Sequence, residues 1–441
     1  MRKIILTGFL SLTMSLTQAQ EINTARIDSF INHIEQFNQS IGAVAITQAG
    51  RNVYHRRFGN ADFPRTASQT GDKYRVGSIT KLLTATMTHQ LFEEGRLRPD
   101  ETLSNYFPDI PNAEKITIAH LLNHTSGLGD YVFKEKKYFF WATEPLSEQA
   151  ILAEIKAQGI LFQPGEGMKY SNSGYYLLAR ILEKVYDKPY PQIIQQQIFT
   201  PLGMKHTLSG VDEDPGISLS YRLNTQNEWK VCRDFYFPNV IGLGDIASTP
   251  DDLNIFLQAL FTGKLVSKES VQKMMPVEKQ IYGQGIMAAP FTDKTLYGHG
   301  GATFGTRSIA LYDTDEDIAM SMCVNGVAIP FNEVLLGVVN GIYNKPNLLA
   351  DYSKLQQYKP DSNSFSQYEG EYTSETVPVK IKVYKEGNDL MMDMTGESPA
   401  YMEAFDKDMF RLSPSGISLE FKPESGQLFL THRGKITEFK K

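Results

Sequence analysis

The sequence is poor in cysteine, with only Cys232 and Cys323 among its 441 residues. Two cysteines are too few for a disulfide scaffold or for a zinc site made of thiolates. They could pair in an oxidising compartment, but they stand far apart, and we expect two small buried residues instead. Basic residues are not in excess either, because 44 Lys and Arg face 50 Asp and Glu. The net charge of −6 argues against nucleic acid as a partner.

Long apolar runs are missing after the N-terminus, so no stable membrane span is expected in the mature chain. The N-terminus itself has two basic residues, a mostly apolar run over residues 4–16, and Thr-Gln-Ala at 17–19. This order is typical of a secretory signal peptide; a buried first helix is the alternative. We therefore predict a signal peptide over residues 1–19, cleavage after Ala19, and a periplasmic or secreted protein.

No H-E-x-x-H motif occurs, and the eight histidines are scattered. His120 and His124 are four residues apart and could share a helix face, but a catalytic zinc site needs a third ligand and an open position. We interpret them as residues that shape the turn after a helix, and we expect neither a metal nor a cofactor. In "STPDDL" (248–253), Thr249 as N-cap and Pro250 at the first position predict the start of a helix. The acidic pair there then needs no catalytic role.

The secondary-structure pattern changes along residues 20–350. Strand-like segments on either side of a turn predict one β-hairpin near the start, with Gly50 in its turn, and a second near the end, around the acidic turn 313–317, while the part from 78 to about 290 is mostly helix and loop. One antiparallel sheet assembled from both ends, with helices packed on it, accounts for this order. We therefore predict an α/β (α+β) sandwich. The elements predicted at its two ends are the helix 22–37, the strands 43–48, 53–57, 308–312 and 318–324, and the helix 331–343.

The composition changes after residue 350. The polar segment 351–365 is predicted to be a linker. Residues 366–441 then show short alternating strands separated by glycine-containing turns, which predict a small β-barrel or lipocalin-like domain. No catalytic residues cluster there, so its expected role is to pack on the main domain or to shape substrate access. Examples of its strands are 379–384, 390–394, 417–421 and 428–432.

The stretch "KYRVGSITKLLTATM" (73–87) places Ser78 three residues before Lys81, at the start of a predicted long helix. Residues at i and i+3 share a helix face, so the lysine amine can reach the serine hydroxyl. A serine nucleophile needs an adjacent base, and a lysine acts as one only when burial or another cation lowers its pKa. The motif alone has a simpler explanation, which is a helix N-cap serine beside a solvated lysine.

Two later stretches change this balance. "KYSNSGYY" puts Tyr170 and Asn172 just before an amphipathic helix, where a phenol could relay a proton and an amide could hold a substrate carbonyl. "YGHGGATFG" puts His299, Gly300 and Gly301 at the start of the late hairpin. Two glycines there let a substrate approach the strand backbone closely. Taken singly, the first stretch is also good cap material, and the second is also a tight turn with an incidental histidine.

S-x-x-K, then Y-x-N, then H-G-G, in this order and at these separations, resemble the motifs of the serine β-lactamase and penicillin-binding protein superfamily. Within it the chain is most similar to the class-C-type serine hydrolase branch, which includes D,D-carboxypeptidases, D-amino-acid peptidases and esterases. The resemblance covers about residues 25–345, and its motifs are jointly highly specific. The longer similar phrases are "YRVGSITK", "ITIAHLLNHTSGL", "FQPGEGMKYSNSGY", "IFTPLGM" and "GLGDIASTPDDL".

The resemblance implies roles for individual residues. Ser78 would be the acylated nucleophile, Lys81 would accept its proton, and Tyr170 would act as general base or proton relay. Asn172 would contact the substrate amide and Lys81. The backbone N–H groups of Ser78 and Ala302 would form the oxyanion hole. The residues implied for substrate binding are Asn172, His299, Gly300, Gly301 and Ala302.

His299 departs from the family pattern, because many members have K-T-G where this chain has H-G-G. The family lysine helps to hold a substrate carboxylate, which a histidine with an unperturbed pKa of about 6.5 does only weakly at neutral pH. The resemblance implies a serine hydrolase that cleaves amide or ester bonds through an acyl-enzyme, as a D,D-carboxypeptidase, D-amino-acid peptidase or esterase, and the signal-peptide pattern predicts that it is secreted. A β-lactamase, an amine acyl transferase and a penicillin-binding sensor without turnover are the alternatives.

The expected partner is a small-molecule or peptide substrate, with peptidoglycan fragments among the candidates. Its identity is expected to depend on segments between the motifs. The aromatic-rich segments 130–141 and 232–240 could line a cleft for an apolar acyl group, or could be packing of a lid. Arg307, soon after H-G-G, could supply the missing positive charge or be a solvated strand residue.

Overall fold

The computed structural model describes most of the chain after the N-terminal segment. The predicted signal peptide (1–19) and most of segment 130–141 lie outside the described residues. Within the described part, no helix is both long and apolar enough to cross a membrane. The described residues are 22–37, 39–59, 72–132, 143–232, 234–277, 280–291, 293–347, 349–353, 358–395 and 399–441.

A six-stranded antiparallel sheet forms the centre of the main domain, with the strand order β2-β1-β10-β9-β8-β7. Its two central strands come from opposite ends of the domain, since β1 (Ser40–Gln48) pairs along its whole length with β10 (Ile318–Val327). The prediction of one sheet assembled from both ends is confirmed. The remaining strands are β2 (Arg51–Phe58), β7 (Met287–Phe291), β8 (Lys294–Ala302) and β9 (Arg307–Asp313).

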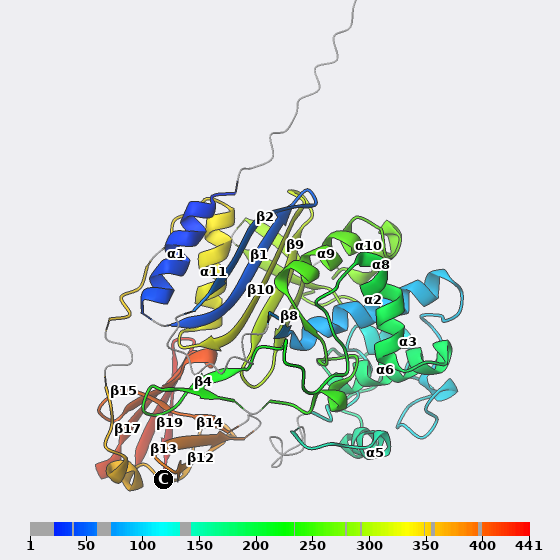
Figure 1. The fold of residues 1–441 in the computed structure, drawn as a ribbon. Coiled ribbons are helices and arrows are strands. Elements are labelled where there is room, and N and C mark those ends of the chain that lie inside the picture. Colours follow the sequence, from blue (N-terminus) through cyan, green and yellow to red (C-terminus); the bar gives the residue numbers. More distant parts are fainter. Residues whose placement is uncertain are drawn as a thin grey trace, which may run out of the picture.

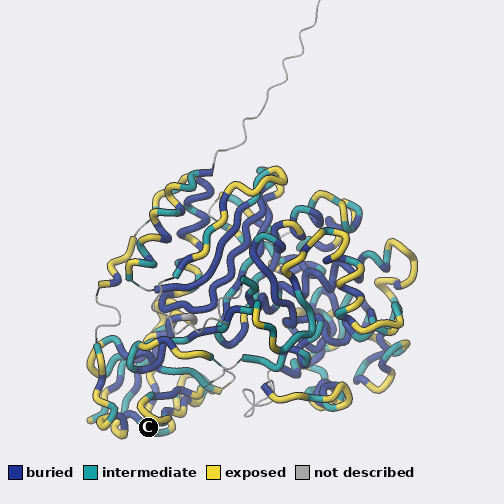
Figure 2. Tube along the Cα trace, viewed as in Figure 1, coloured by how far each residue is buried: buried dark blue, intermediate teal, exposed yellow. Residues whose placement is uncertain are grey.

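Helices cover both faces of this sheet, as Figure 1 shows. α1 (Thr24–Gln36) and α11 (Phe331–Ile342) pack side by side on one face, and α9 (Pro250–Phe261) lies on the other. Every residue of β10 is buried (Figure 2), because alternate side chains enter different cores. Met322 joins the core with α1 and α11, whereas Cys323 joins the core of the larger helical layer. The predicted sandwich is therefore confirmed. No disulfide joins the two cysteines, and Cys323 is buried as expected, whereas Cys232 is only partly buried.

The larger helical layer is built around α2 (Thr80–Glu93), which is buried at every residue from Thr80 to His89. A helix buried on all sides belongs in the middle of a core. Its threonines are tolerated there because Thr84 and Thr88 return their hydroxyls to carbonyl oxygens four residues earlier. The other elements of the main domain are α3 (Ile118–Leu122), α5 (Glu148–Gln158), α6 (Asn172–Tyr186), α7 (Tyr190–Ile194), α8 (Thr200–Leu202), α10 (Lys268–Met274), and the short ladders of β3 (Tyr74–Arg75) with β6 (Ala247–Ser248) and β4 (Tyr221–Leu223) with β5 (Trp229–Val231).

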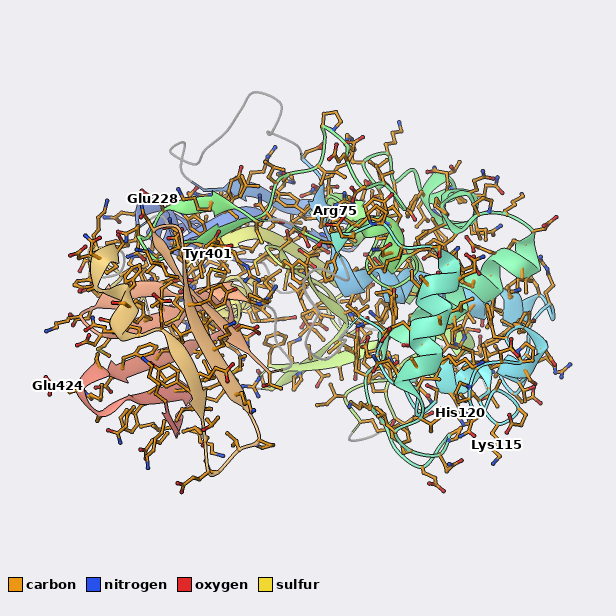
Figure 3. The ribbon with its side chains drawn as sticks, turned by 90° about the horizontal axis from the view of Figure 1, so that it is seen from below. Arg75, Lys115, His120, Glu228, Tyr401 and Glu424 are labelled. Carbon is orange, nitrogen blue, oxygen red and sulfur yellow. The ribbon has the colours of Figure 1, made fainter. Side chains whose placement is uncertain are left out.

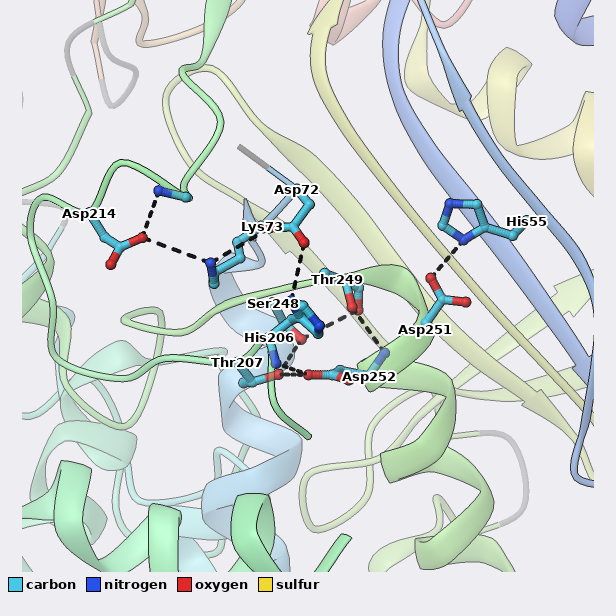
Figure 4. Close-up of polar contacts among 11 residues, drawn as sticks. His55, Asp72, Lys73, His206, Thr207, Asp214, Ser248, Thr249, Asp251 and Asp252 are labelled. Carbon is cyan, nitrogen blue, oxygen red and sulfur yellow. Dashed lines mark hydrogen bonds and ion pairs between the residues drawn. The ribbon is translucent and has the colours of Figure 1, made fainter. Parts of the chain in front are cut away.

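The start of α9 follows the prediction from "STPDDL". Thr249 is the N-cap and accepts a hydrogen bond from the Asp252 N–H at 3.1 Å, and Pro250 is the first helical residue. Figure 4 shows that both acidic side chains tie other segments to this helix. The Asp252 carboxylate accepts the backbone N–H of His206 at 2.8 Å, and Asp251 lies 2.7 Å from His55 of β2. The acidic pair is explained by these contacts.

The C-terminal domain is a separate barrel-like sheet with the strand order β14-β13-β12-β11-β19-β18-β17-β16-β15. Its apolar side chains form a core of their own, which Phe365 joins from ahead of the first strand. The predicted small all-β domain is confirmed as a fold; its boundaries at 351 and 366 stay predictions. The strands are β11 (Gly370–Thr373), β12 (Lys380–Glu386), β13 (Asp389–Met394), β14 (Ala400–Tyr401), β15 (Glu403–Asp406), β16 (Met409–Leu412), β17 (Ile417–Lys422), β18 (Gln427–His432) and β19 (Lys435–Lys440).

Candidate active site

Ser78 lies in a short 3-10 turn. The sequence predicted a long helix that begins at Ser78, but the helix begins two residues later. The turn spans Gly77–Ile79, and α2 follows from Thr80. The N-cap positions of these two elements are Val76 and Ile79, so Ser78 is not a helix cap. A Cβ on Gly77, whose φ is +51°, would come within 2.8 Å of the Ala302 backbone. The glycine therefore lets the turn press against the end of β8.

Lys81 is completely buried, as a solvated surface lysine would not be. Its Nζ lies 3.0 Å from the Ser78 Oγ. It also lies 2.8 Å from the Asn172 Oδ1 and 3.0 Å from the carbonyl oxygen of Leu243. Burial lowers the pKa of Lys81 to about 7, although the Asp130 carboxylate opposes the shift. In the neutral amine the two N–H groups go to the two oxygens that can only accept, which leaves the lone pair for the Ser78 hydroxyl.

Tyr170 is the second group that contacts the serine hydroxyl. Its side chain hydrogen-bonds to Ser78, and the Lys81 Nζ lies 4.9 Å from the centre of its ring. Burial raises the pKa of the Tyr170 phenol well above its ordinary value. The phenol therefore keeps its proton at neutral pH. The Ser78 hydroxyl thus contacts an amine with a lowered pKa and a phenol with a raised pKa. Two titratable groups whose pKa values are shifted apart in this way are typical of an acid–base pair.

His124 holds the backbone on both sides of Tyr170. Its carbonyl oxygen accepts the N–H of Lys169 at 3.0 Å, and its Nδ1 accepts the N–H of Ser171 at 3.2 Å. The rings of His124 and Tyr170 lie 4.3 Å apart, centre to centre. His120, four residues earlier, closes the capping box of α3 instead. The two histidines therefore shape local backbone, as the sequence suggested, and His124 does so beside the site.

Asn172 is oriented by Asp130. One oxygen of this carboxylate accepts the Asn172 side-chain amide at 2.9 Å and the Asn172 backbone N–H at 3.0 Å. The other accepts the N–H of Val132 at 2.9 Å. Because the amide nitrogen is turned toward Asp130, the amide oxygen must face Lys81. The Asp130 carboxylate therefore orients the Asn172 amide so that its oxygen accepts the hydrogen bond from Lys81.

His299 is buried and neutral. Its Nε2 accepts a hydrogen bond from the hydroxyl of Tyr282 at 2.8 Å, and its Nδ1 donates to the carbonyl oxygen of Gly300. Burial, together with the charge of Lys81, lowers the pKa of His299 to about 3. A histidine in this state carries no charge at neutral pH, so it does not replace the family lysine as a cation.

Ser78 lines a pocket of about 440 Å³, a size that suits a small ligand. Tyr170, Asn172 and Ala302 line it as well, whereas the three residues of H-G-G do not. Both domains contribute to its walls. From the main domain come Gly77, Val132, Arg222, Leu223, Phe235, Val240, Leu243, Gly244, Thr303, Phe304 and Arg307, and from the C-terminal domain Met392, Met394, Ala400, Tyr401, Glu403, Leu412, Ser415, Ile417 and His432.

A family model described as Beta-lactamase matches residues 30–336, which is more than half of the chain. The chain belongs to the beta-lactamase family. Penicillin-binding protein 4* of Bacillus subtilis (strain 168) is 28% identical over 419 residues, covering 88% of this chain and 90% of that protein. An alignment of this extent reaches into the C-terminal domain.

Two further relatives of this beta-lactamase-family chain match a smaller share of it. D-alanyl-D-alanine-carboxypeptidase/endopeptidase AmpH of Escherichia coli (strain K12) is 28% identical over 242 residues, covering 53% of this chain and 60% of that protein. The crystal structure of D-amino acid amidase from Ochrobactrum anthropi SV3 matches with a TM-score of 0.64 and 27% identity, covering 73% of this chain and 98% of that one. The chain is therefore a serine hydrolase of the beta-lactamase-like family, as its motifs predicted.

Three contributors to the site were missed from the sequence: Asp130, the imidazole of His124 beside Tyr170, and the carbonyl oxygen of Leu243. His124 stands within "ITIAHLLNHTSGL", and Asp130 follows it by two residues. This phrase is already similar to the beta-lactamase family, so it was the available signal. The backbone carbonyl at 243 gives no signal in the residue type. Its contribution depends on how the chain folds around Lys81.

Proposed function

We propose that this protein cleaves amide or ester bonds of substrates that contain D-amino acids, as a D,D-carboxypeptidase, D-amino-acid peptidase or esterase, through an acyl-enzyme on Ser78. The observation that carries the proposal is the buried amine of Lys81, 3.0 Å from the Ser78 Oγ and with a lowered pKa. The names of a carboxypeptidase and a D-amino acid amidase among the relatives support the substrate class. Export through the signal peptide at 1–19 is part of the same proposal and is supported by the sequence pattern.

In the proposed reaction, the proton of the Ser78 hydroxyl passes to the lone pair of Lys81 while the Oγ attacks the substrate carbonyl carbon. The backbone N–H groups of Ser78 and Ala302 stabilise the oxyanion, and the close approach of Gly77 to Ala302 supports this pairing. Tyr170 gives its proton to the leaving amine or alcohol and takes the one held by Lys81. Water then attacks the ester on Ser78 by the same transfers, which releases the acid and restores the hydroxyl.

Covalent trapping tests this proposal. A fluorophosphonate probe should add its mass to the peptide that contains Ser78, and the Ser78→Ala variant should gain none. A panel of D- and L-amino acid amides, a D-Ala-D-Ala peptide, short esters and β-lactams should show preferential turnover of the D-amino acid compounds. Equal labelling of the variant would overturn the assignment of Ser78, and equal rates for the D and L compounds would overturn the substrate class.

The pH dependence of kcat/KM should report Lys81. Below a pKa of about 7 the amine is protonated and has no lone pair for the Ser78 hydroxyl. Tyr170, which gives its proton to the leaving group, keeps that proton throughout because burial raises its pKa, so it adds no fall at high pH. With an uncharged ester, we expect kcat/KM to increase about tenfold per pH unit below pH ~7 and to level off above it. A rate that falls as the pH rises through 7 would contradict Lys81 as the base.

A further inference from the structure

The turn between β4 and β5 fixes the C-terminal domain against the main domain. Thr225 in this turn is completely buried, and its hydroxyl accepts the N–H of Leu390 at 2.7 Å and donates to the Leu390 carbonyl oxygen at 3.2 Å. The side-chain amide of Asn227 donates to the carbonyl oxygen of Ala404 at 2.7 Å. The preceding strand β4 contributes Leu223 to the pocket. The same hairpin therefore carries the docking turn and lines the pocket.

The C-terminal domain supplies a mainly apolar wall to the pocket that contains Ser78. Its acidic lining residue, Glu403, is 3% exposed and already accepts the Nε of Arg411 at 3.1 Å and the N–H of Ser413 at 3.2 Å. That carboxylate is neutralised within the domain. Figure 3 shows Tyr401 at the edge of this domain, beside the hairpin that carries Glu228. The apolar residues of the wall are Met392, Met394, Ala400, Leu412 and Ile417.

The main domain contributes two aromatic side chains to the pocket, beside Arg222, Thr303 and Arg307. The rings of Phe235 and Phe304 stack with their centres 4.2 Å apart and an angle of 22° between their planes. Asp234 fixes the loop that carries Phe304, because its carboxylate accepts the Phe304 N–H at 3.1 Å and the Thr303 hydroxyl at 2.6 Å. Arg222, which also lines the pocket, donates to the Phe304 carbonyl oxygen. These polar contacts hold the loop of Phe304 in position.

We propose that the apolar wall and the two phenylalanines form a subsite for an apolar group of the substrate, and that the C-terminal domain thereby sets substrate selectivity. The inference rests on the proposed function, because the subsite is continuous with the pocket around Ser78. An aliphatic chain or an aromatic ring would be buried between the stacked phenylalanines and the wall that contains Met392 and Met394. Removing this apolar surface from water stabilises the bound state. That group could belong to the acyl part or to the leaving part of the substrate.

Two series of esters test the subsite in the full-length protein. One series keeps p-nitrophenol as leaving group and lengthens the acyl chain from acetate to octanoate. The other keeps the acetyl group and enlarges the leaving alcohol from phenol to naphthol. In each series the readout is the ratio of kcat/KM for the largest substrate to kcat/KM for the smallest.

We expect Ala400→Trp, which fills the subsite, to lower this ratio at least about tenfold in one of the two series. Met394→Glu places a charge in the apolar wall and is expected to lower the ratio in the same series, which keeps the test available if the tryptophan prevents folding. Ile436→Trp is the matched control, because Ile436 is 65% exposed on β19 and does not line the pocket. This control should leave both ratios unchanged within about twofold.

The two proposals fail in different ways. The responding series tells whether the subsite takes the acyl or the leaving part, and either answer supports it. If Ser78→Ala abolishes acetate hydrolysis but neither Ala400→Trp nor Met394→Glu moves either ratio, the subsite is overturned and the proposed function stands. If the Ser78→Ala variant hydrolyses the acetate ester at the original rate, the proposed function is overturned, whatever the two ratios show.

Discussion

Replacing Ser78 with alanine is expected to lower kcat/KM roughly 10⁴-fold or more for any substrate that the protein turns over. The substitution removes the atom that forms the acyl-enzyme, while Lys81, Tyr170 and the backbone N–H groups remain in place. Activity is measured with the best compound of the substrate panel, and thermal unfolding confirms that the variant folds. A variant that keeps more than a tenth of the activity would contradict Ser78 as the nucleophile.

Ser267→Ala is the matched control, because it makes the same chemical change at a true helix cap. Ser267 is the N-cap of α10, and its hydroxyl accepts the N–H of Ser270 at 3.2 Å. Its loss should cost about 1 kcal/mol of stability and leave kcat/KM unchanged. The pair of variants separates the two interpretations of S-x-x-K, since a cap serine affects stability and a nucleophile affects rate.

A double-mutant cycle extends this prediction to Lys81. Lys81→Met removes the amine and fills much of the same buried space, but it leaves the Asn172 Oδ1 and the Leu243 carbonyl oxygen without this donor, so thermal unfolding is used to check that the variant folds. We expect kcat/KM to fall about as far as in Ser78→Ala, and no further in the double variant, because groups that act as one unit lose their effect together. Additive losses in the double variant would mean that the two residues act separately.

Elements with a strong local pattern were predictable from the sequence, and elements formed by tertiary contacts were not. β1 and β10 are mostly apolar runs of strand length that stand beside turns, at Gly50 and at 313–317, so two hairpins could be predicted from the residues. β7 was missed, since its residues Met287–Phe291 are all partly or fully exposed and show no alternation. The hairpin of β4 and β5 was missed as well, because its three-residue strands are stabilised by docking of their turn on the C-terminal domain.

The candidate site was predictable to the same extent. The i, i+3 spacing predicted that Lys81 could reach Ser78, and the two lie within hydrogen-bond distance. Whether the lysine is a base depends on its burial, which comes from the packing of α2 on all sides and is not visible in the motif. The same holds for His299, whose neutral state results from burial and from the hydroxyl of Tyr282. Residue types and spacing therefore predicted the positions, and tertiary packing determined the protonation states.

Gly301→Ala is expected to be among the most damaging single substitutions in the main domain. A Cβ at Gly301 would lie 1.9 Å from the Val76 carbonyl oxygen and 2.4 Å from the Ser308 Oγ. Those two atoms are themselves joined by a hydrogen bond of 2.8 Å, so neither can move freely. The sequence suggested that the glycine admits a substrate, but the close neighbour is the backbone two residues before Ser78. We expect a loss of about 3 kcal/mol in stability, and a roughly 100-fold fall in kcat as Ser78 is displaced.

Gly300→Ala is the matched control for this prediction, because it adds the same methyl group to the neighbouring residue. A Cβ at Gly300 would meet the Ile309 Cδ1 at 3.4 Å and the Ser308 carbonyl oxygen at 3.8 Å, which are ordinary contacts. Its stability should therefore change by less than about 1 kcal/mol. Thermal and denaturant unfolding of the two variants make the comparison, together with kcat. Equal stability of the two variants would mean that β8 moves away from Val76 without cost, and that the position of Ser78 does not depend on the glycine.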